Sequence, residues 1–402
     1  MDARTGLPVV GMVGAGQLAR MTHQAAIALG QSLHVLADGV DDSAAQVAAR
    51  VQVGDYRALA DLRRFAAGCD VVTFDHEHVP SEHIRALVAD GVAVFPGPDA
   101  LRYAQDKAAM RARLGELGLP VPRWVDLSGA ADPNQALAGF AAEVGWPVVL
   151  KTIRGGYDGR GVWVLGSPEQ ARQVIAATPT GLLAEELVPI VRELAADVAR
   201  SPFGQGAAWP VVQTVQADGI CVEVIAPAPQ LPDDLADEAQ DMALRLAREL
   251  DVVGVLAVEL FQVAEQDARE TAAYSGRLIV NELAMRPHNS AHWTIEGART
   301  SQFEQHLRAV LDYPLGATTP TAPVTVMANV LAGADDVVPK GIDERLHHCM
   351  ARWPDVRIHL YGKAMRPGRK VGHVTALGTD LAEVRARARG AAGYLANGDG
   401  HG

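Results

Sequence analysis

The first quarter of the chain alternates short apolar runs with helical patterns, and this feature limits the possible folds more than any other. The runs VVGMV, LHVLA, VVTF and VAVF are rich in β-branched residues and are separated by segments of helical periodicity, between Pro8 and about Pro98. Alternation of strand and helix predicts a parallel sheet with helices on both faces. We therefore expect a Rossmann-like domain over residues 1–105.

The pattern changes twice further along the chain. Residues 99–117 have a charged helical pattern, and the LPVP that follows cannot continue a helix. After Pro147 come short apolar strands, glycine-rich or polar loops and one amphipathic helix over residues 232–250, which together predict an α+β domain with an antiparallel sheet. A last unit begins near Pro323 and ends in an Ala/Arg-rich helix. The expected domains are 1–105, 106–320 and 321–402.

The composition is that of a globular protein with an acidic surface. Hydrophobic residues make up 49% of the 402 residues, no apolar run approaches the roughly 20 residues of a membrane helix, and no signal peptide is evident. A net charge of −12 disfavours nucleic-acid binding. Cys69, Cys221 and Cys349 lack CxxC spacing, which argues against disulfides or a zinc site. We expect a soluble, cytoplasmic protein that binds anionic substrates through a local basic cluster.

A glycine-rich turn follows the first predicted strand. Gly14 and Gly16 open a helix, and Asp38 lies about 20 residues on, as in dinucleotide-binding folds. The turn alone is weak evidence, because any helix N-terminus of this kind can hold a phosphate and any tight turn favours glycine. An NAD(P)-dependent dehydrogenase and a purely structural turn therefore stay open, and we favour a turn that faces a monophosphate.

A lysine and a second glycine-rich loop indicate a nucleotide phosphate site. Lys151 ends the strand WPVVLK, and GGYDGRG follows at residues 155–161. Loop amides and a fixed ammonium group can bind phosphate oxygens together, although a simple hairpin would also explain the glycines. Glu259 and Glu282 lie near the ends of two strands that we expect to be neighbours. Carboxylates beside bound phosphates are the usual ligands of Mg²⁺, whereas a single glutamate is more often just solvated.

The order of these features resembles the ATP-grasp superfamily, which makes acyl phosphates and transfers them to amines. The strings GGYDGRG, RPHNSAHW (residues 286–293) and KAMRPGRKVGH (residues 363–373) are similar to signature segments of the N5-carboxyaminoimidazole ribonucleotide synthase family. The resemblance implies a pre-ATP-grasp domain, an ATP-grasp domain and a small C-terminal domain. It also implies an ATP- and Mg²⁺-dependent ligase that carboxylates 5-aminoimidazole ribonucleotide with bicarbonate in purine biosynthesis, and a homodimer.

The resemblance assigns roles by position. For ATP it implies phosphate contacts from Lys107, Lys151 and the loop Gly156, Tyr157, Asp158, Gly159, Arg160 and Gly161, adenine contacts from Glu185, Glu186, Leu187 and Val188, and further contacts from Glu193, Gln216, Asn281 and Glu282. For Mg²⁺ it implies Glu259 and Glu282. For the ribonucleotide we expect contacts from Gly16, Gln17, Leu18, Glu77, His288, Asn289, Lys363, Arg366, Arg369 and Lys370, and catalytic roles for Tyr157, Asp158, Arg160 and His292.

Three residues depart from the family pattern. Met285 stands where proline is usual, Asp75 where glutamate is more familiar, and Gln216 where some members have histidine. A formate-dependent ribonucleotide transformylase of the same superfamily would have the same ATP site but would not need HNSAHW and RPGRKVGH together. A non-catalytic nucleotide-binding regulator is the alternative outside enzymology. Either His292 or the leaving phosphate could accept the proton of the amine, and the sequence does not choose between them.

Overall fold

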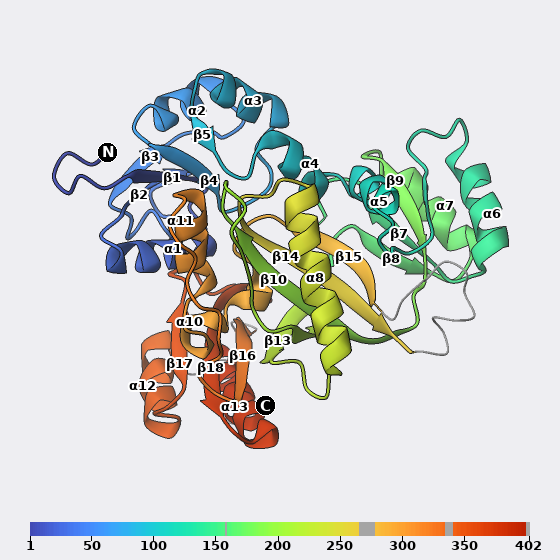
Figure 1. Ribbon diagram of the computed structural model, residues 1–402. Helices are drawn as coiled ribbons and strands as arrows, with labels where there is room; N and C mark the ends of the chain where they lie inside the picture. Colours follow the sequence, from blue (N-terminus) through green and yellow to red (C-terminus); the bar gives the residue numbers. More distant parts are fainter. Residues whose placement is uncertain (157–158, 265–277, 334–340, 399–402) are drawn as a thin grey trace.

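The computed structural model describes residues 1–156, 159–264, 278–333 and 341–398, whose strands form three sheets (Figure 1). The first is a five-stranded parallel sheet of order β3-β2-β1-β4-β5. Its strands are β1 (Val9–Val13), β2 (Ser32–Ala37), β3 (Arg50–Val53), β4 (Val71–Phe74) and β5 (Ala93–Val94). Its helices are α1 (Gln17–Ala28), α2 (Leu59–Ala66) and α3 (Ser81–Ala89). The predicted parallel α/β domain is confirmed.

The charged segment after this sheet forms two helices where the sequence predicted one. α4 (Pro98–Gln105) and α5 (Lys107–Glu116) are separated by Asp106, which has an extended backbone. The Asp106 side chain accepts a hydrogen bond of 2.9 Å from the N–H of Ala109. An aspartate cap satisfies an otherwise unpaired amide at a helix N-terminus. This cap places Lys107 at the first turn of α5.

A small four-stranded sheet follows, of order β6-β9-β7-β8, and all of its pairs are antiparallel. It consists of β6 (Trp124–Asp126), β7 (Val148–Thr152), β8 (Val162–Leu165) and β9 (Leu182–Glu186). The helices α6 (Pro133–Val144) and α7 (Pro168–Ala177) pack on it through an apolar cluster that includes Leu137, Leu150 and Ala171. β9 and β7 are the two central strands of this sheet and pair with a neighbour on each side. This pairing fixes the positions of the residues at their ends.

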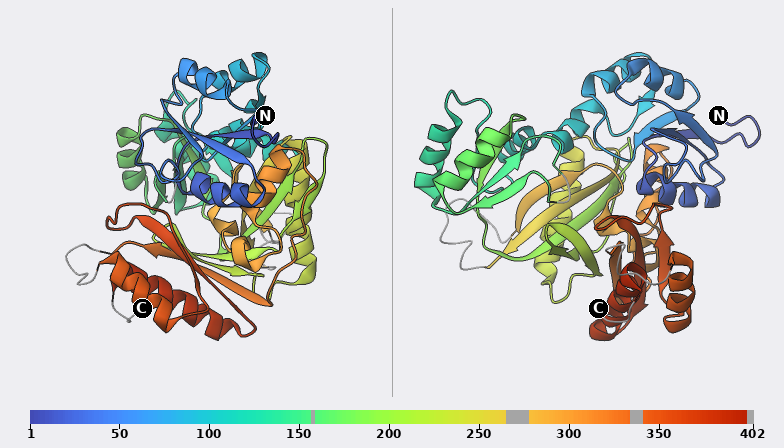
Figure 2. Two further views of the ribbon diagram at one scale, coloured as in Figure 1. Left: turned by 90° about the vertical axis from the view of Figure 1, so that its left-hand side faces the viewer. Right: turned by 180° about the vertical axis from the view of Figure 1, so that it is seen from behind.

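The third sheet is long, antiparallel and continuous across the predicted boundary near residue 321. Its main path is β15-β14-β10-β12-β13-β16-β18-β17, with β11 (Gly206–Ala208) beside β10. The path contains β10 (Ile190–Arg200), β12 (Val212–Ala217), β13 (Ile220–Ala226), β14 (Gly254–Val263), β15 (Leu278–Ala284), β16 (Val324–Leu331), β17 (Arg357–Leu360) and β18 (Lys370–Gly378). Figure 2 shows the four-stranded sheet, in teal and green, and the C-terminal strands at different ends of the molecule.

Helices cover both parts of the long sheet. The helix α8 (Asp233–Glu249) confirms the predicted amphipathic helix and packs against β10 and β14, while α12 (Ile342–Arg352) and α13 (Leu381–Asn397) belong to the C-terminal part. The short elements η1 (Asn289–Ala291), α10 (Thr294–Gly297) and α11 (Gln302–Val310) follow β15. None of the helices within the described residues has the length and apolar character needed to cross a membrane.

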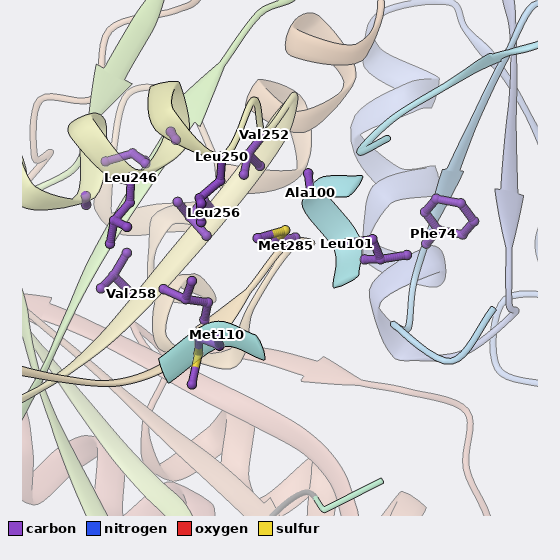
Figure 3. Close-up of a cluster of buried hydrophobic side chains, with 14 of the residues drawn as sticks. Phe74, Ala100, Leu101, Met110, Leu246, Leu250, Val252, Leu256, Val258 and Met285 are labelled. Atoms are coloured by element: carbon purple, nitrogen blue, oxygen red, sulfur yellow. The ribbon is translucent and has the colours of Figure 1, made fainter. Parts of the chain in front are cut away.

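One hydrophobic cluster joins the first sheet to the long sheet. Figure 3 shows Met285, after β15, between Ala100 and Leu101 of α4 and Leu256 of β14. All four side chains are buried, and Met285 is 0% exposed. Burying side chains of this size stabilises the fold by about 1.5–3 kcal/mol each. The two sheets therefore share a core, and the walls of the space between them are fixed.

Candidate active site

A cavity of about 1780 Å³ lies where the three sheets meet. Its wall includes the glycine turn after β1, the ends of β14 and β15, and the segment before β18. Of the residues predicted to form the site, the lining includes Gly16, Gln17, Leu18, Glu77, Lys107, Gly156, Arg160, Glu259, Glu282, His288, Asn289, Lys363, Arg369 and Lys370. The structure thus brings half of the predicted site residues to one cavity.

The glycine turn is occupied by the side chain of Asp75. The N–H of Gly16 donates a hydrogen bond to Asp75 Oδ2, and a Cβ built on Gly14 would lie 1.8 Å from Asp75 Oδ1. Gly14 also has a φ of +99°, which favours glycine. Burial raises the pKa of Asp75 to about 6, although the hydrogen bond from Gly16 opposes the rise. A pyrophosphate in this turn would meet a carboxylate, which disfavours dinucleotide binding.

The basic segment after β17 docks on the first domain. Lys363 Nζ donates a hydrogen bond of 2.7 Å to Gln17 Oε1, and Ser43 Oγ donates one of 2.5 Å to the carbonyl of Tyr361. Arg369 and Lys370 line the cavity as well. Arg366 is exposed and does not line it. The structure therefore brings three of the four predicted cations to the same cavity as the glycine turn, and Lys363 contacts Gln17 directly after that turn.

The two predicted phosphate-binding lysines each contact a carboxylate. Lys107 Nζ lies 2.8 Å from Glu282 Oε1, and Lys151 Nζ lies 2.8 Å from Glu185 Oε2. Arg111, which the sequence analysis missed, is fully buried and pairs with Glu185 at 2.7 Å. Burial alone would raise the pKa of Glu185, but the charges of Arg111 and Lys151 outweigh it and lower the pKa to about 2. Glu185 is thus an ionised partner that fixes Lys151, and neither residue lines the cavity.

Glu259 and Glu282 face each other across β14 and β15, so the prediction that these strands are neighbours is confirmed. Both line the cavity. Burial and then the charge of Glu282 raise the pKa of Glu259, whereas Lys107 and Lys151 overcome the effect of burial and lower the pKa of Glu282. Asn281 lies beside them, with Lys151 Nζ at 3.0 Å from its Oδ1. Two carboxylates that face each other on paired strands repel, which favours a cation between them.

The predicted adenine and ribose residues lie at the junction of β9 and β10. Glu186 Oε2 accepts a hydrogen bond of 2.8 Å from Arg123, Leu187 is exposed and Val188 is buried. Glu193, in β10, has a hydrogen bond to the Gln216 side chain, and burial raises the pKa of Glu193. These side chains do not line the large cavity. They lie along the strand that leads from the small sheet toward Glu259.

The glycine-rich loop between β7 and β8 is described at Gly155, Gly156 and residues 159–161; Tyr157 and Asp158 lie outside the described residues. Gly159 and Gly161 both have a φ of +74°, and a Cβ on Gly161 would lie 2.5 Å from Thr152 Oγ1. These glycines are therefore required by the backbone. Arg160 and Gly156 reach the cavity wall, and Gly159 packs on the turn at Gly219.

The HNSAHW segment divides between the cavity and the core. His288 lines the cavity, with its Nε2 3.4 Å from Glu259 Oε1, and Asn289 is held by reciprocal hydrogen bonds with Asn329. His292 is 0% exposed and does not line the cavity; its Nδ1 is 2.8 Å from Gln302 Nε2. Burial lowers the pKa of His292 well below its usual value. The structure thus presents His288, and not His292, to the cavity.

Comparison with known proteins agrees with this architecture. Residues 7–105 match the ribonucleotide synthetase preATP-grasp domain, residues 112–303 the ATP-grasp domain, and residues 325–387 the phosphoribosylaminoimidazole carboxylase C-terminal domain. Fold and site together define an ATP-grasp ligase.

Curated and solved relatives narrow the class. The chain is 61% identical to the N5-carboxyaminoimidazole ribonucleotide synthase of Mycobacterium tuberculosis, over 97% of this chain and 88% of the relative, and 48% identical to that of Corynebacterium ammoniagenes, over 98% and 93%. It also matches the Aspergillus clavatus enzyme solved with ADP and 5-aminoimidazole ribonucleotide, with a TM-score of 0.84 and 31% identity over 96% and 98% of the chains. The chain belongs to the N5-carboxyaminoimidazole ribonucleotide synthase family, which are ATP-dependent ligases of purine biosynthesis.

Proposed function

We propose that ATP, bicarbonate and 5-aminoimidazole ribonucleotide react in the cavity between the three sheets. The observation that supports this most is that one cavity is lined by two kinds of groups. Lys107, Glu259 and Glu282 suit phosphoryl transfer, whereas Lys363 and Arg369 suit the monophosphate of a nucleotide. A single space that binds both substrates lets an activated carboxyl group form and react without passing through water.

On the ATP side, the chain positions the phosphates with Lys107, Lys151 and the described amides of the β7–β8 loop. The Lys151 ammonium is held by Glu185 and Asn281, at 2.8 and 3.0 Å, so little freedom remains to be lost on binding. The segment Glu186–Val188 would contact adenine, and Glu193 the ribose hydroxyls. Fixed charges next to the transferred phosphoryl group stabilise its transition state more than mobile ones do.

Glu259 and Glu282 would hold magnesium. They are two half-buried carboxylates on paired strands; desolvation and then the charge of Glu282 raise the pKa of Glu259, and a divalent cation would offset that repulsion. Mg²⁺ is usually bound by one or two carboxylates together with substrate phosphates and water, which is the set of ligands that these two residues and bound ATP would provide. The metal, when bound, neutralises charge on the phosphates of ATP.

On the ribonucleotide side, Arg369 and Lys370 would bind the monophosphate, with Lys363 fixed on Gln17. The turn at Gly16 and Glu77 complete this side of the cavity. The guanidinium group of Arg369 can bind two phosphate oxygens at once, which the ammonium of a lysine cannot. In this arrangement the exocyclic amine would face His288 and Glu259, which line the same cavity.

Bicarbonate is a weak electrophile, so its carboxyl group is activated by phosphorylation from ATP. Breakdown of carboxyphosphate releases phosphate and carbon dioxide, and the amine nitrogen then forms a bond to that carbon and loses a proton. His288 is the imidazole that lines the cavity, and we place it as the acceptor of that proton or as a hydrogen-bond partner of the leaving phosphate. Burial of His292 makes it a support for the wall.

A coupled assay of ADP release tests the proposal. We expect ADP formation to require Mg²⁺ and bicarbonate and to rise when 5-aminoimidazole ribonucleotide is added, because both substrates complete the site. Activity with formate and a glycinamide ribonucleotide, and none with 5-aminoimidazole ribonucleotide, would assign the chain to a formate-dependent transformylase. We also propose that the protein is a homodimer, which sedimentation at several concentrations tests. We further propose that it acts in the cytoplasm, which the three free cysteines support.

A further inference from the structure

A buried carboxylate lies behind the wall of the cavity. Asp197, in β10, is 1% exposed, and its two oxygens lie 2.9 and 3.2 Å from Ser290 Oγ. In the described part of the chain, Ser290 is its only side-chain hydrogen-bond partner and no cation pairs with it. A buried carboxylate without a cation destabilises a fold, and an apolar residue of similar size would cost less. The retention of this carboxylate therefore points to a task other than stability.

Ser290 connects Asp197 to the cavity. It lies in the η1 turn, and its Oγ is 2.8 Å from His288 Nδ1. The other ring nitrogen, His288 Nε2, is on the cavity side, 3.4 Å from Glu259 Oε1. Asp197, Ser290 and His288 thus form a chain of hydrogen bonds that begins in the core of the long sheet and ends at the substrate wall.

Counting protons along this chain assigns a donor to each contact. A carboxylate only accepts hydrogen bonds and a serine hydroxyl has one proton, so Ser290 donates to Asp197 and accepts from His288 Nδ1–H. The backbone N–H of Ser290 also approaches Nδ1, but at 3.4 Å this contact is much longer than the 2.8 Å contact with Oγ. The cavity-side nitrogen then has a free lone pair. Its distance of 3.4 Å from Glu259 is longer than a charged hydrogen bond and requires no proton between them.

We propose that Asp197, acting through Ser290, is a positioning residue that fixes the ring orientation and the tautomer of His288, so that Nε2 faces the substrate as a hydrogen-bond acceptor. The backbone of His288 is fixed as well. Its N–H donates to Gln302 Oε1 and its carbonyl accepts from Gln302 Nε2, both at 2.7 Å. A neutral imidazole with Nδ1 protonated is what an N–H of the exocyclic amine needs as its partner. The role of the exocyclic amine rests on the proposed function, whereas the tautomer of His288 follows from its contacts in the structure alone.

Nitrogen NMR of the folded, wild-type protein tests the tautomer directly. In protein labelled with ¹⁵N-histidine at pH 8, where imidazoles are neutral, we expect His288 to have a protonated Nδ1 and a bare Nε2. Burial raises the pKa of Asp197 to about 7, so the carboxylate form prevails at this pH. The signal is assigned by its loss in His288→Gln. A His288 signal with Nε2 protonated overturns the proposal whatever the variants do.

Three variants separate positioning from general damage to the core. Ser290→Ala removes the bridge, and we expect mixed tautomers and a kcat for ribonucleotide-dependent ADP release at least tenfold lower, with KM for ATP within twofold of wild type. Ser290→Thr keeps the hydroxyl and should restore both the tautomer and most of kcat. Ser201→Ala is the matched control, since Ser201 is also a buried serine, directly after β10, but its Oγ has no hydrogen-bond partner. We expect it to change neither measurement.

Asp197→Asn provides an independent comparison. The amide can donate to Ser290 Oγ, which lets the hydroxyl donate to Nδ1 and moves the ring proton to Nε2, so we expect the tautomer to shift and kcat to fall without a lower melting temperature. An unchanged tautomer and unchanged kcat in both Asp197→Asn and Ser290→Ala would overturn the proposal. If the tautomer responds but no ribonucleotide-dependent activity exists in any variant or in wild type, the proposed function fails and the positioning role stands.

Discussion

The backbone N–H of Met285 donates a hydrogen bond of 2.8 Å to Glu77 Oε1. Residue 285 is one of the three positions where the sequence departs from the family pattern, and a proline there would have no N–H to donate. The other Glu77 oxygen lies 3.2 Å from Arg286 Nε. In this chain Glu77 therefore has two partners, the backbone N–H of Met285, directly after β15, and the guanidinium group of Arg286.

Met285→Pro should weaken this arrangement. The substitution removes the hydrogen bond to Glu77 and part of a buried side chain, so we expect the free energy of unfolding to fall by about 2 kcal/mol and KM for 5-aminoimidazole ribonucleotide to rise. Urea denaturation and steady-state kinetics measure the two effects. Met285→Leu keeps both the N–H and most of the volume, and it should stay close to wild type. Equal behaviour of the two variants would show that the Glu77 contact contributes little.

Glu282→Gln should remove activity and leave the protein folded. The change deletes one anionic ligand at a site where charge matters more than shape, and the amide oxygen can still accept from Lys107, which lies 2.8 Å from Glu282. Circular dichroism checks the fold, and ADP release at several Mg²⁺ concentrations checks the role. Turnover within about tenfold of wild type corresponds to a barrier change of only about 1.4 kcal/mol and would count against metal binding.

Arg369→Ala should raise KM for the ribonucleotide at least tenfold and leave KM for ATP nearly unchanged, because Arg369 lines the cavity next to Lys370. Arg366→Ala is the matched control: Arg366 is in the same segment, has the same charge and is exposed like Arg369, but it lies outside the lining, so we expect less than a threefold change. Initial-rate kinetics with each substrate varied in turn decide the matter. A fall in ATP affinity instead would place the segment at the nucleotide.

Asp197→Asn should change how stability depends on pH. Burial raises the pKa of Asp197 from 3.8 to about 7, so its contribution to stability is most favourable below pH 4 and is lost as the pH rises through 7. Asparagine does not titrate, so we expect the variant to gain about 2 to 3 kcal/mol relative to wild type between pH 5 and pH 8. Denaturation at both pH values measures the gain. Asp251→Asn, at a carboxylate that is 84% exposed, is the control and should show almost no gain.

The sequence predicted most of the strands, and it failed where the local pattern is ambiguous. The runs at β1, β2 and β4 were found because they are mainly apolar and rich in β-branched residues. β10 was missed because IVRELAADVAR mixes charged and alanine residues, and only its position between β12 and β14 makes it a strand. β3 was missed because it is a partly exposed edge strand of four residues. Tertiary pairing outweighs local propensity at both places.

The candidate site was predicted where a charged side chain lies near a strand end, as at Lys151 and Glu282. The groups behind them were not found, because their roles depend on contacts between distant segments. Arg111 is an ordinary helix arginine in the sequence, and only the fold turns it onto Glu185, 74 residues away. Asp197 is likewise one acidic residue among many until the fold places it under Ser290.

The continuity of the long sheet has a mechanical consequence. β13 pairs with β16 along four residue pairs, Glu223 to Ala226, so the strands that hold Glu259 and Glu282 and the strand that begins at Lys370 belong to one hydrogen-bonded structure. A cut near residue 321 would leave β13 as an open edge, a template for aggregation, and would not release an independent module. The sequence therefore divides into a second and a third segment near residue 321, but one continuous sheet joins these two segments in the structure. Glu259, Glu282 and Lys370 therefore lie on one sheet, whereas the loop that contains Gly156 and Arg160 connects strands of the separate four-stranded sheet.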